Sequence, residues 1–203
     1  FRVTFPSTER WMVHPVSLEK DEYIHLFAAC GDALFAAGNR HLYEIKAGEK
    51  IRLGPGDYHD LAAADDQTLV AASDEGLAIY KFSGEEWIKT PIETTATYAH
   101  DLTPFHHQVW FIDNENQVHL IDPQAKRSRI IEVPGSGDIR KMETIHGTLY
   151  IEGTHNLWQW NTEKKQFVSL DDSPFLREIL SADIIKKTES RLWLVYTHPP
   201  SVC

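Results

Sequence analysis

The sequence contains only two cysteines among its 203 residues, and its 20 lysines and arginines are outnumbered by 30 acidic residues. Cys30 and Cys203 cannot supply a disulfide framework, and neither belongs to a metal-type cysteine spacing. A bridge between the two stays open, and Cys30 is expected to be a small buried hydrophobe. The net charge of −10 argues against nucleic acid as a partner. The best basic cluster, residues 126–129, is interpreted as a solvated hairpin turn.

Long apolar runs are also missing. No stretch approaches the 18 residues that a transmembrane helix needs, so membrane insertion is not expected. We find no signal-peptide pattern, and a chain that starts at Phe1 is interpreted as a trimmed or mature product. There is no Gly-x-Ser-x-Gly nucleophile turn and no glycine-rich phosphate loop. These absences leave catalysis without a recognisable motif, and no cofactor is expected.

A repeat of short apolar segments is present instead. Five segments of similar pattern are anchored by leucines or a valine that lie 35, 40, 40 and 43 residues apart: Leu34, Leu69, Val109, Leu149 and Leu192. A period near 40 residues with several strands in each unit is the sequence signature of a β-propeller. The chain is therefore expected to be all-β, with five four-stranded antiparallel blades in one domain spanning residues 1–203.

Each unit can be divided into four strands, A to D from the inside outward, and the anchors above belong to strand B. Strand A is anchored seven or eight residues earlier, at Leu26, Leu61, Leu102, Met142 and Ile184. Strand C follows at Leu42, Leu77, Val118 and Leu157, after turns rich in Gly and Asn that tolerate positive φ angles. Strand D is expected at residues 50–53, 87–90, 129–133 and 166–170. Trp11 and Trp87, on outer strands, are expected to be exposed.

The fifth unit lacks strands C and D after Leu192, whereas the amino terminus offers two strands without a blade, Phe1–Phe5 and Arg10–Val13. We therefore predict that blade five is shared between about residues 1–15 and 179–203. Pairing of the amino-terminal strands with the carboxyl-terminal strands would close the ring and leave no incomplete blade. A fragment of a larger propeller is the alternative.

Residues 69–80, followed by Trp87, resemble the two-component-regulator propeller repeat, as do residues 147–160. The shared pattern is an apolar-aromatic strand, a small-residue turn, a Leu-plus-aromatic strand and then a hairpin. The resemblance implies a propeller that serves as a sensor or ligand-binding region outside the cytoplasm. A periplasmic or extracellular location is accordingly favoured over a cytoplasmic one. The chain departs from that family because tryptophan is missing from its first two B strands.

Candidate binding residues cluster where strand D leads into the next strand A, because these connections and the B–C turns converge on one face of a propeller. The triplet His-Asp-Leu occurs there twice, at residues 59–61 and 100–102. Regular strand alternation would point the His and the Asp to opposite faces of the blade. The expected ligand-binding set on this face is His25, His59, Asp60, His100, Asp101, Arg140 and Asp183, together with His41 and His155 from B–C loops.

An architectural role is the competing interpretation of these residues. In WD-repeat propellers, Asp and His side chains at such turns form hydrogen bonds within and between blades. A buried carboxylate or imidazole with a partner offsets its own desolvation. A zinc site would need three converging ligands, and no spacing indicates one, so no metal is predicted.

The sequence thus favours a non-catalytic recognition module that binds a protein, a peptide or a small polar or glycan ligand through the funnel face. The alternative is a glycosidase-like or metal-dependent hydrolase with acids around the central axis. A pair of such acids would need carboxyl groups about 5–9 Å apart. The B–C loops are too short to build a long substrate cleft, which favours binding over turnover.

Overall fold

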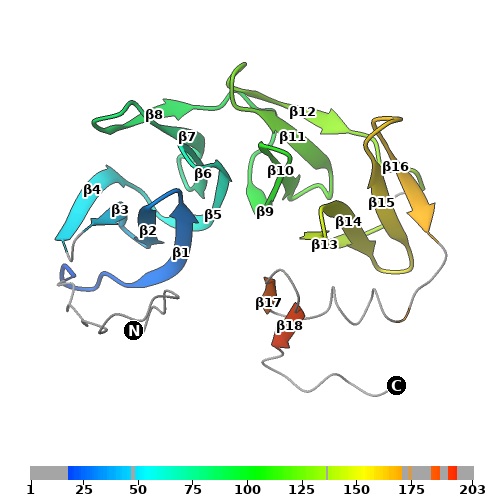
Figure 1. Ribbon diagram of the computed structural model, residues 1–203, viewed down its shortest axis with the longest axis horizontal. Coiled ribbons are helices and arrows are strands. Elements are labelled where there is room, and N and C mark those ends of the chain that lie inside the picture. The colour runs from blue at the N-terminus through cyan, green and yellow to red at the C-terminus, as the bar shows by residue number, and fades with distance from the viewer. Residues whose placement is uncertain are drawn as a thin grey trace. The chain divides into compact units, whose positions relative to one another are not determined.

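The computed structural model describes residues 18–46, 49–135, 137–170, 174, 184–187 and 192–195. The chain divides after Pro91 into two compact units, Phe1–Pro91 and Ile92–Cys203. Within the described residues, no helix has the length and apolar character required to span a membrane. Figure 1 shows the labelled strands of both units.

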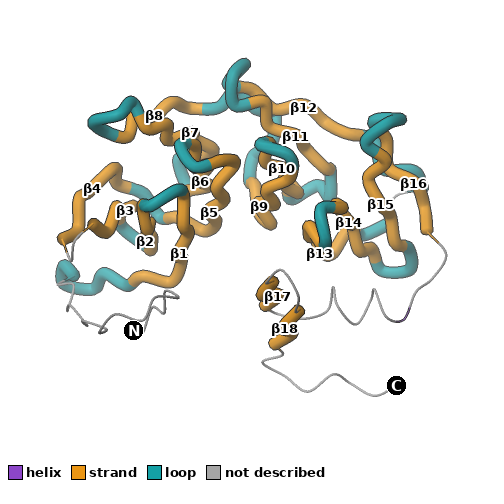
Figure 2. Tube along the Cα trace, in the orientation of Figure 1, coloured by secondary structure: helices purple, strands orange, loops and turns teal. Residues whose placement is uncertain are grey.

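The first unit contains two four-stranded antiparallel sheets. One has the order β1 (Ile24–Cys30), β2 (Ala33–Gly38), β3 (His41–Lys46) and β4 (Glu49–Pro55). The other has the order β5 (Tyr58–Asp65), β6 (Thr68–Ser73), β7 (Gly76–Phe82) and β8 (Trp87–Pro91). Each strand pairs with its neighbour in sequence through a short turn, which gives the up-and-down meander of a propeller blade (Figure 2).

The second unit contains two more such sheets and a shorter one. The sheets comprise β9 (Ala99–Phe105), β10 (Gln108–Asp113), β11 (Val118–Asp122) and β12 (Arg127–Ile131), followed by β13 (Ile139–Ile145), β14 (Thr148–Gly153), β15 (Leu157–Asn161) and β16 (Gln166–Leu170). A two-stranded antiparallel sheet follows, made of β17 (Ile184–Lys187) and β18 (Leu192–Val195). These strands contain the A and B anchors that the repeat assigns to a fifth blade.

The repeat therefore predicts the four complete blades correctly, and every strand anchor falls in the expected strand. Five four-stranded blades were expected, and the described residues contain four. The expected outer half of blade five, residues 1–15, lies outside the described residues, so ring closure stays a prediction. The outer strands β4 and β12 differ from their expected bounds by one or two residues at each end. Strand β12 begins at Arg127, not Arg129, so most of the basic cluster forms a strand rather than a turn.

Aromatic side chains fill the space between neighbouring sheets within each unit. In the second unit, the ring of Trp110 on β10 meets Trp160 of β15 edge-on, with centroids 4.7 Å apart, and Phe167 of β16 at 5.8 Å. All three lie in one buried cluster. Such sheet-on-sheet packing requires large side chains, and edge-to-face contacts are the favoured aromatic arrangement.

Trp87 corrects an expectation of exposure. It lies on the outer strand β8, yet it is half-buried, because its ring packs edge-on against Phe35 of β2 at a centroid distance of 4.8 Å. The outer strand of the second blade thus contributes a tryptophan to the core between the first two blades. Trp11 lies outside the described residues.

Cys30 is buried, as expected, and its thiol donates a hydrogen bond to the carbonyl oxygen of Asp65 at 3.1 Å. Burial raises the pKa of this thiol to about 11. Since the thiolate is the reactive species, we expect Cys30 in a Cys203→Ser chain to react with iodoacetamide about 100-fold more slowly when folded than in guanidinium chloride. Equal alkylation rates in the two states would show that the thiol is accessible.

Candidate functional site

Each blade brings the start of strand A against its own B–C turn. Backbone hydrogen bonds join the residue that opens the turn to the residue before strand A: Asn39 N–H to Tyr23 O (3.4 Å), Asp74 N–H to Asp57 O (3.0 Å) and Thr154 N–H to Asp138 O (3.0 Å). In the third blade the hydroxyl of Thr97 donates to Oδ1 of Asn114 at 2.9 Å. The D–A connections and the B–C turns therefore share one end of every blade. We call this end of a blade its D–A/B–C face.

A β-bulge interrupts the inner strand of each of the four complete blades at this end. The pairing register shifts between Ile24 and Leu26, between Tyr58 and Asp60, and between Ile139 and Lys141. In the third blade the shift lies opposite Trp110 and Ile112, and Asp101 there has a φ of 56°. Bulges redirect side chains and bend the strand. The regular alternation on which the expectation of opposite His and Asp directions rests is therefore interrupted at this position.

Asp101 connects two blades of the second unit. Its Oδ2 accepts a hydrogen bond from the N–H of Met142 on β13, and Thr103 donates to the carbonyl of the same methionine at 3.1 Å. Asp60 instead accepts from the N–H of the next residue, Leu61, at 2.8 Å. The Asp101 carboxylate thus has the architectural contact that the competing interpretation expects.

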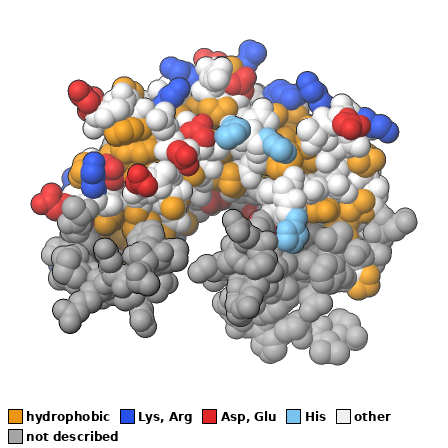
Figure 3. All heavy atoms as spheres, viewed as in Figure 1, with side chains coloured by type: hydrophobic (Ala, Val, Ile, Leu, Met, Phe, Trp, Pro, Cys, Tyr) orange, Lys and Arg blue, Asp and Glu red, His pale blue; other side chains and the backbone are white. Residues whose placement is uncertain are grey.

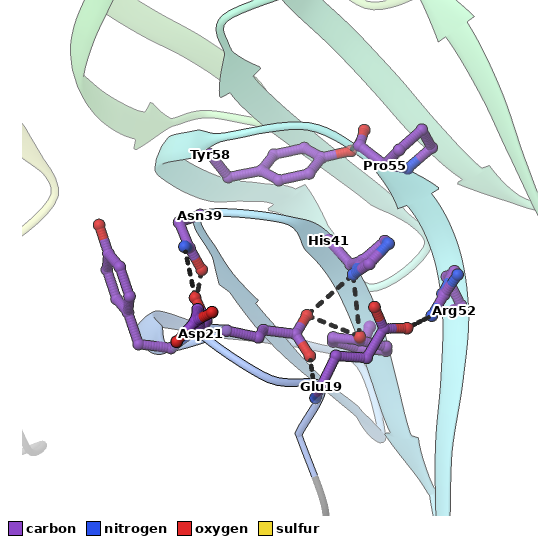
Figure 4. A network of polar contacts seen from close by, with 10 residues as sticks. Glu19, Asp21, Asn39, His41, Arg52, Pro55 and Tyr58 are labelled. Atoms are coloured by element: carbon purple, nitrogen blue, oxygen red, sulfur yellow. Dashed lines mark hydrogen bonds and ion pairs between the residues drawn. The ribbon is translucent and has the colours of Figure 1, made fainter.

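His41 is not a loop residue, although the sequence placed it in a B–C loop. It is the first residue of β3 and is buried. Its Nδ1 lies 2.8 Å from Oε1 of Glu22, and the hydroxyl of Tyr43 donates to the same carboxylate oxygen at 2.7 Å. Figure 4 shows this network beside the ion pair of Arg52 with Glu19. Through these hydrogen bonds, His41 holds the connection before β1 against β3, the third strand of the same blade.

The network shifts two pKa values. Burial alone would raise the pKa of Glu22, but hydrogen bonds from the Glu19 amide, His41 and Tyr43, together with the charge of His41, lower it to about 2. Burial and the bond to the Glu22 carboxylate raise the pKa of Tyr43 to about 12. Glu22 is thus a buried anion held by donors on three sides.

A second architectural pair escaped the sequence interpretation. Nε2 of His119 lies 2.8 Å from Oδ2 of Asp113, both side chains are buried, and the imidazole stacks on Phe111 at 4.5 Å. The other oxygen of Asp113 accepts from the amides of Glu115 and Gln117 in the B–C turn. This His–Asp contact joins β10 to β11 across the B–C turn. The sequence signal for this pair was an Asp and a His on either side of one B–C turn.

The remaining expected residues are accessible. His25, Arg140 and His155 are exposed, and His59 and His100 are half-buried. The structure places four of them, His25, His59, His100 and Arg140, at the second position of the four complete inner strands. His155 lies in the B–C turn of the fourth blade. Asp183 lies outside the described residues.

Two exposed tyrosines on this face were missed. Tyr23 and Tyr98 precede β1 and β9 and are 56% and 46% exposed. Each ring lies beside the histidine two residues later, Tyr23 with His25 at 5.5 Å and Tyr98 with His100 at 6.2 Å. The sequence signal for these tyrosines was the pattern Tyr-x-His, which occurs at equivalent positions in two blades. We call these the Tyr-x-His pairs.

The described residues contain no group of three or more His, Cys, Asp or Glu side chains that could hold a metal ion. An open depression of about 370 Å³ lies at the opposite end of the second unit. Phe105, Trp160 and the turns at residues 147–148 and 161–163 line it. Its turns lie at the end of the blade opposite to the D–A/B–C face, and the sequence did not indicate it.

No protein-family model and no curated protein matches the chain. Solved structures do resemble it. They include the extracellular domain assigned to a hybrid two-component system of B. thetaiotaomicron (TM-score 0.53, 10% identity, 74% of this chain and 22% of that one). Human WBSCR16 gives a TM-score of 0.57 at 11% identity over 85% of this chain and 59% of that one. The dihydro-heme d1 dehydrogenase NirN gives 0.55 at 14% identity over 75% and 38%.

The chain thus spans less than two thirds of each of these structures. At such identities the likeness shows the fold alone, which is propeller-like. The resemblance to two-component-regulator propeller repeats is supported at that level, while no family model confirms the repeat family.

Proposed function

We propose that this chain is a recognition module that binds a partner through the D–A/B–C face of a five-bladed ring. In this proposal β17 and β18 are the inner half of blade five, and residues 1–15 are its outer half. The ring makes equivalent positions of all blades face one end. The partner is a protein or peptide, or a small polar or glycan ligand.

The Tyr-x-His pairs are the observation that carries the proposal. An exposed tyrosine costs little conformational entropy when it is fixed, and it offers both a flat apolar surface and a hydroxyl. The adjacent imidazole adds a donor or acceptor within the same small area. Because two blades carry the pair at the same position, the pairs are more than isolated exposed aromatic residues, which are normal on any surface.

The carboxylates on this face favour binding over hydrolysis. A catalytic pair needs carboxyl groups that converge on an open site. Glu22 is held by His41 and Tyr43, and Asp101 accepts from the Met142 amide. Glu22 is thus engaged within its own blade, and Asp101 is engaged between two blades. The hydrolase alternative would have to recruit others, such as Asp183.

A thermal-shift screen of the chain against sugars, short peptides, nucleotides and metal ions tests the proposal. We expect a ligand that raises the melting temperature of the parent chain. The shift should be lost in two double variants, Tyr23→Ala with His25→Ala and His100→Ala with Arg140→Ala. Both double variants should fold with stabilities near that of the parent, because Tyr23, His25 and Arg140 are exposed and His100 is only half-buried, and surface substitutions usually change stability by no more than about 0.5 kcal/mol each.

Ile88→Ala is the matched control, since Ile88 is 50% exposed on β8 and lies away from the D–A/B–C face. It should leave the ligand-induced shift unchanged. A shift that survives both double variants would place the binding site elsewhere. A ligand that is consumed during the assay would favour the hydrolase alternative.

A further inference from the structure

The outer edge of β12 is already used by another segment of the chain. Glu93 forms a parallel bridge with Arg127, in which its N–H donates to the carbonyl of Lys126 and its carbonyl accepts from the N–H of Ser128, both at 2.9 Å. The hydroxyl of Ser128 also donates to that of Thr94 at 2.7 Å. The edge of the third blade therefore accepts an extended segment, and the segment it accepts carries an acidic residue.

This pairing ends halfway along the strand. Because Ser128 directs its amide away from β11, the amide of Ile130, two residues later, points the same way in a pleated strand. The covering segment turns away after Thr94. The Thr94 hydroxyl accepts a hydrogen bond from the N–H of Ala96 at 3.1 Å, which is the geometry of a turn. In the described residues no backbone bond is seen on the outward side of Ile130.

The exposed side chains of β12 differ between the two faces of the strand, with cationic side chains on one face and an aliphatic side chain on the other. Arg127 and Arg129 are exposed on one face of β12, and Ile130 on the other face is 53% exposed. Lys126 adds a third cation at the turn before the strand. Figure 3 shows Lys and Arg side chains over β12. A cationic strip of this kind is unusual in a chain whose net charge is −10.

We propose that the outer edge of β12 binds an extended segment of a partner protein in which acidic residues alternate with aliphatic ones. The partner's backbone pairs with the outward carbonyl of Ser128 and the outward amide of Ile130, beyond the part of the edge that Glu93 covers. Its acidic side chains face Arg129, and its aliphatic side chains cover Ile130. Main-chain bonds supply the affinity, and the charge alternation supplies the selectivity. This surface lies on the rim of the blade and does not depend on the proposed D–A/B–C site.

The test uses the full chain and two synthetic peptides, acetyl-Glu-Ile-Glu-Val-Glu-Ile-Glu-amide and its counterpart with lysine in place of every glutamate. We expect the acidic peptide to bind with a Kd below about 1 mM, more weakly at high salt, and to slow hydrogen exchange at the Ile130 amide. The basic peptide should not bind. Binding of both peptides alike, or of neither at millimolar concentration, would overturn the proposal.

Four variants separate backbone pairing from charge. Ile130→Pro removes the outward amide at an edge position that tolerates proline, and it should abolish binding, whereas Ile130→Thr keeps the amide and should weaken binding only a few-fold. Arg129→Glu should reduce affinity at least tenfold, and Arg129→Lys should retain most of it. If Ile130→Pro folds, as judged by circular dichroism, and still binds like the parent, the peptide does not add a strand and the proposal is wrong.

Discussion

Alanine at position 38 is expected to destabilise the first blade by on the order of 3 kcal/mol. Gly38 ends β2, and a Cβ atom built there would lie 1.7 Å from the carbonyl oxygen of Tyr23. That oxygen belongs to the backbone and accepts the Asn39 amide, so it cannot move without breaking the bond between the D–A connection and the B–C turn. Urea denaturation followed by tryptophan fluorescence measures the loss.

Gly137→Ala is the matched control. Gly137 lies in the connection before β13, with no atom within 4 Å of a built Cβ, so its substitution should change stability by less than about 0.5 kcal/mol. Because the clash displaces Tyr23, Gly38→Ala should also weaken binding of any ligand that depends on Tyr23. Stability equal to that of the control would mean that the close approach of β2 and the D–A connection is not rigid.

Glu22→Gln is the second change with a large expected effect. The pKa of Glu22 is lowered from 4.5 to about 2 in the folded chain. A depressed folded pKa contributes stability above the unfolded pKa, and that contribution disappears as the pH falls from about 4.5 to about 2. The shift corresponds to a contribution on the order of 3 kcal/mol at neutral pH. We therefore expect Glu22→Gln to lower stability at pH 7 and to matter progressively less toward pH 2.

Urea denaturation of parent and variant at pH 7, 4.5 and 2.5 measures this difference. Glu75→Gln is the control, because Glu75 pairs with Lys89 at 2.9 Å on the surface, where such pairs contribute less than about 1 kcal/mol. A gap between the parent and Glu22→Gln that stays constant over this pH range would show that the Glu22 carboxylate is not held as an anion by His41 and Tyr43.

The sequence period predicted the blades because every unit must bury apolar side chains at the same positions of its strands. Leu69 and Val109 are fully buried at equivalent positions, and their apolar spacing is a consequence of that packing. The turns were likewise predictable, since Gly and Asn supply positive φ angles where hairpins need them. The start of β12 was misplaced because Arg127 and Arg129 look like turn residues, whereas they lie on an exposed edge where charge is favoured.

The site was predictable only in part. The positions of His25 and His100 followed from the repeat. The bulge beside each of them leaves no periodic trace in the sequence, so the interruption of strand alternation at Asp101 was not predicted. The role of His41 depends on Glu22, 19 residues earlier, and a contact at that separation cannot be inferred from local pattern. The alternation of apolar and polar residues indicates which positions are buried, whereas the hydrogen-bond partner of a polar side chain depends on the three-dimensional fold.

Cysteine cross-linking between the two ends of the chain tests the proposed five-bladed ring most directly. In a Cys203→Ser background, where Cys30 is expected to be inert, Val3→Cys and Leu194→Cys are introduced. Neighbouring antiparallel strands bring Cα atoms to about 4.5–5.5 Å, within the range of a disulfide. The ring predicts an intramolecular disulfide for this pair or for its one-residue register neighbours at Arg2 or Thr4. If none of these folded variants forms one under mild oxidation, the chain ends do not share a blade.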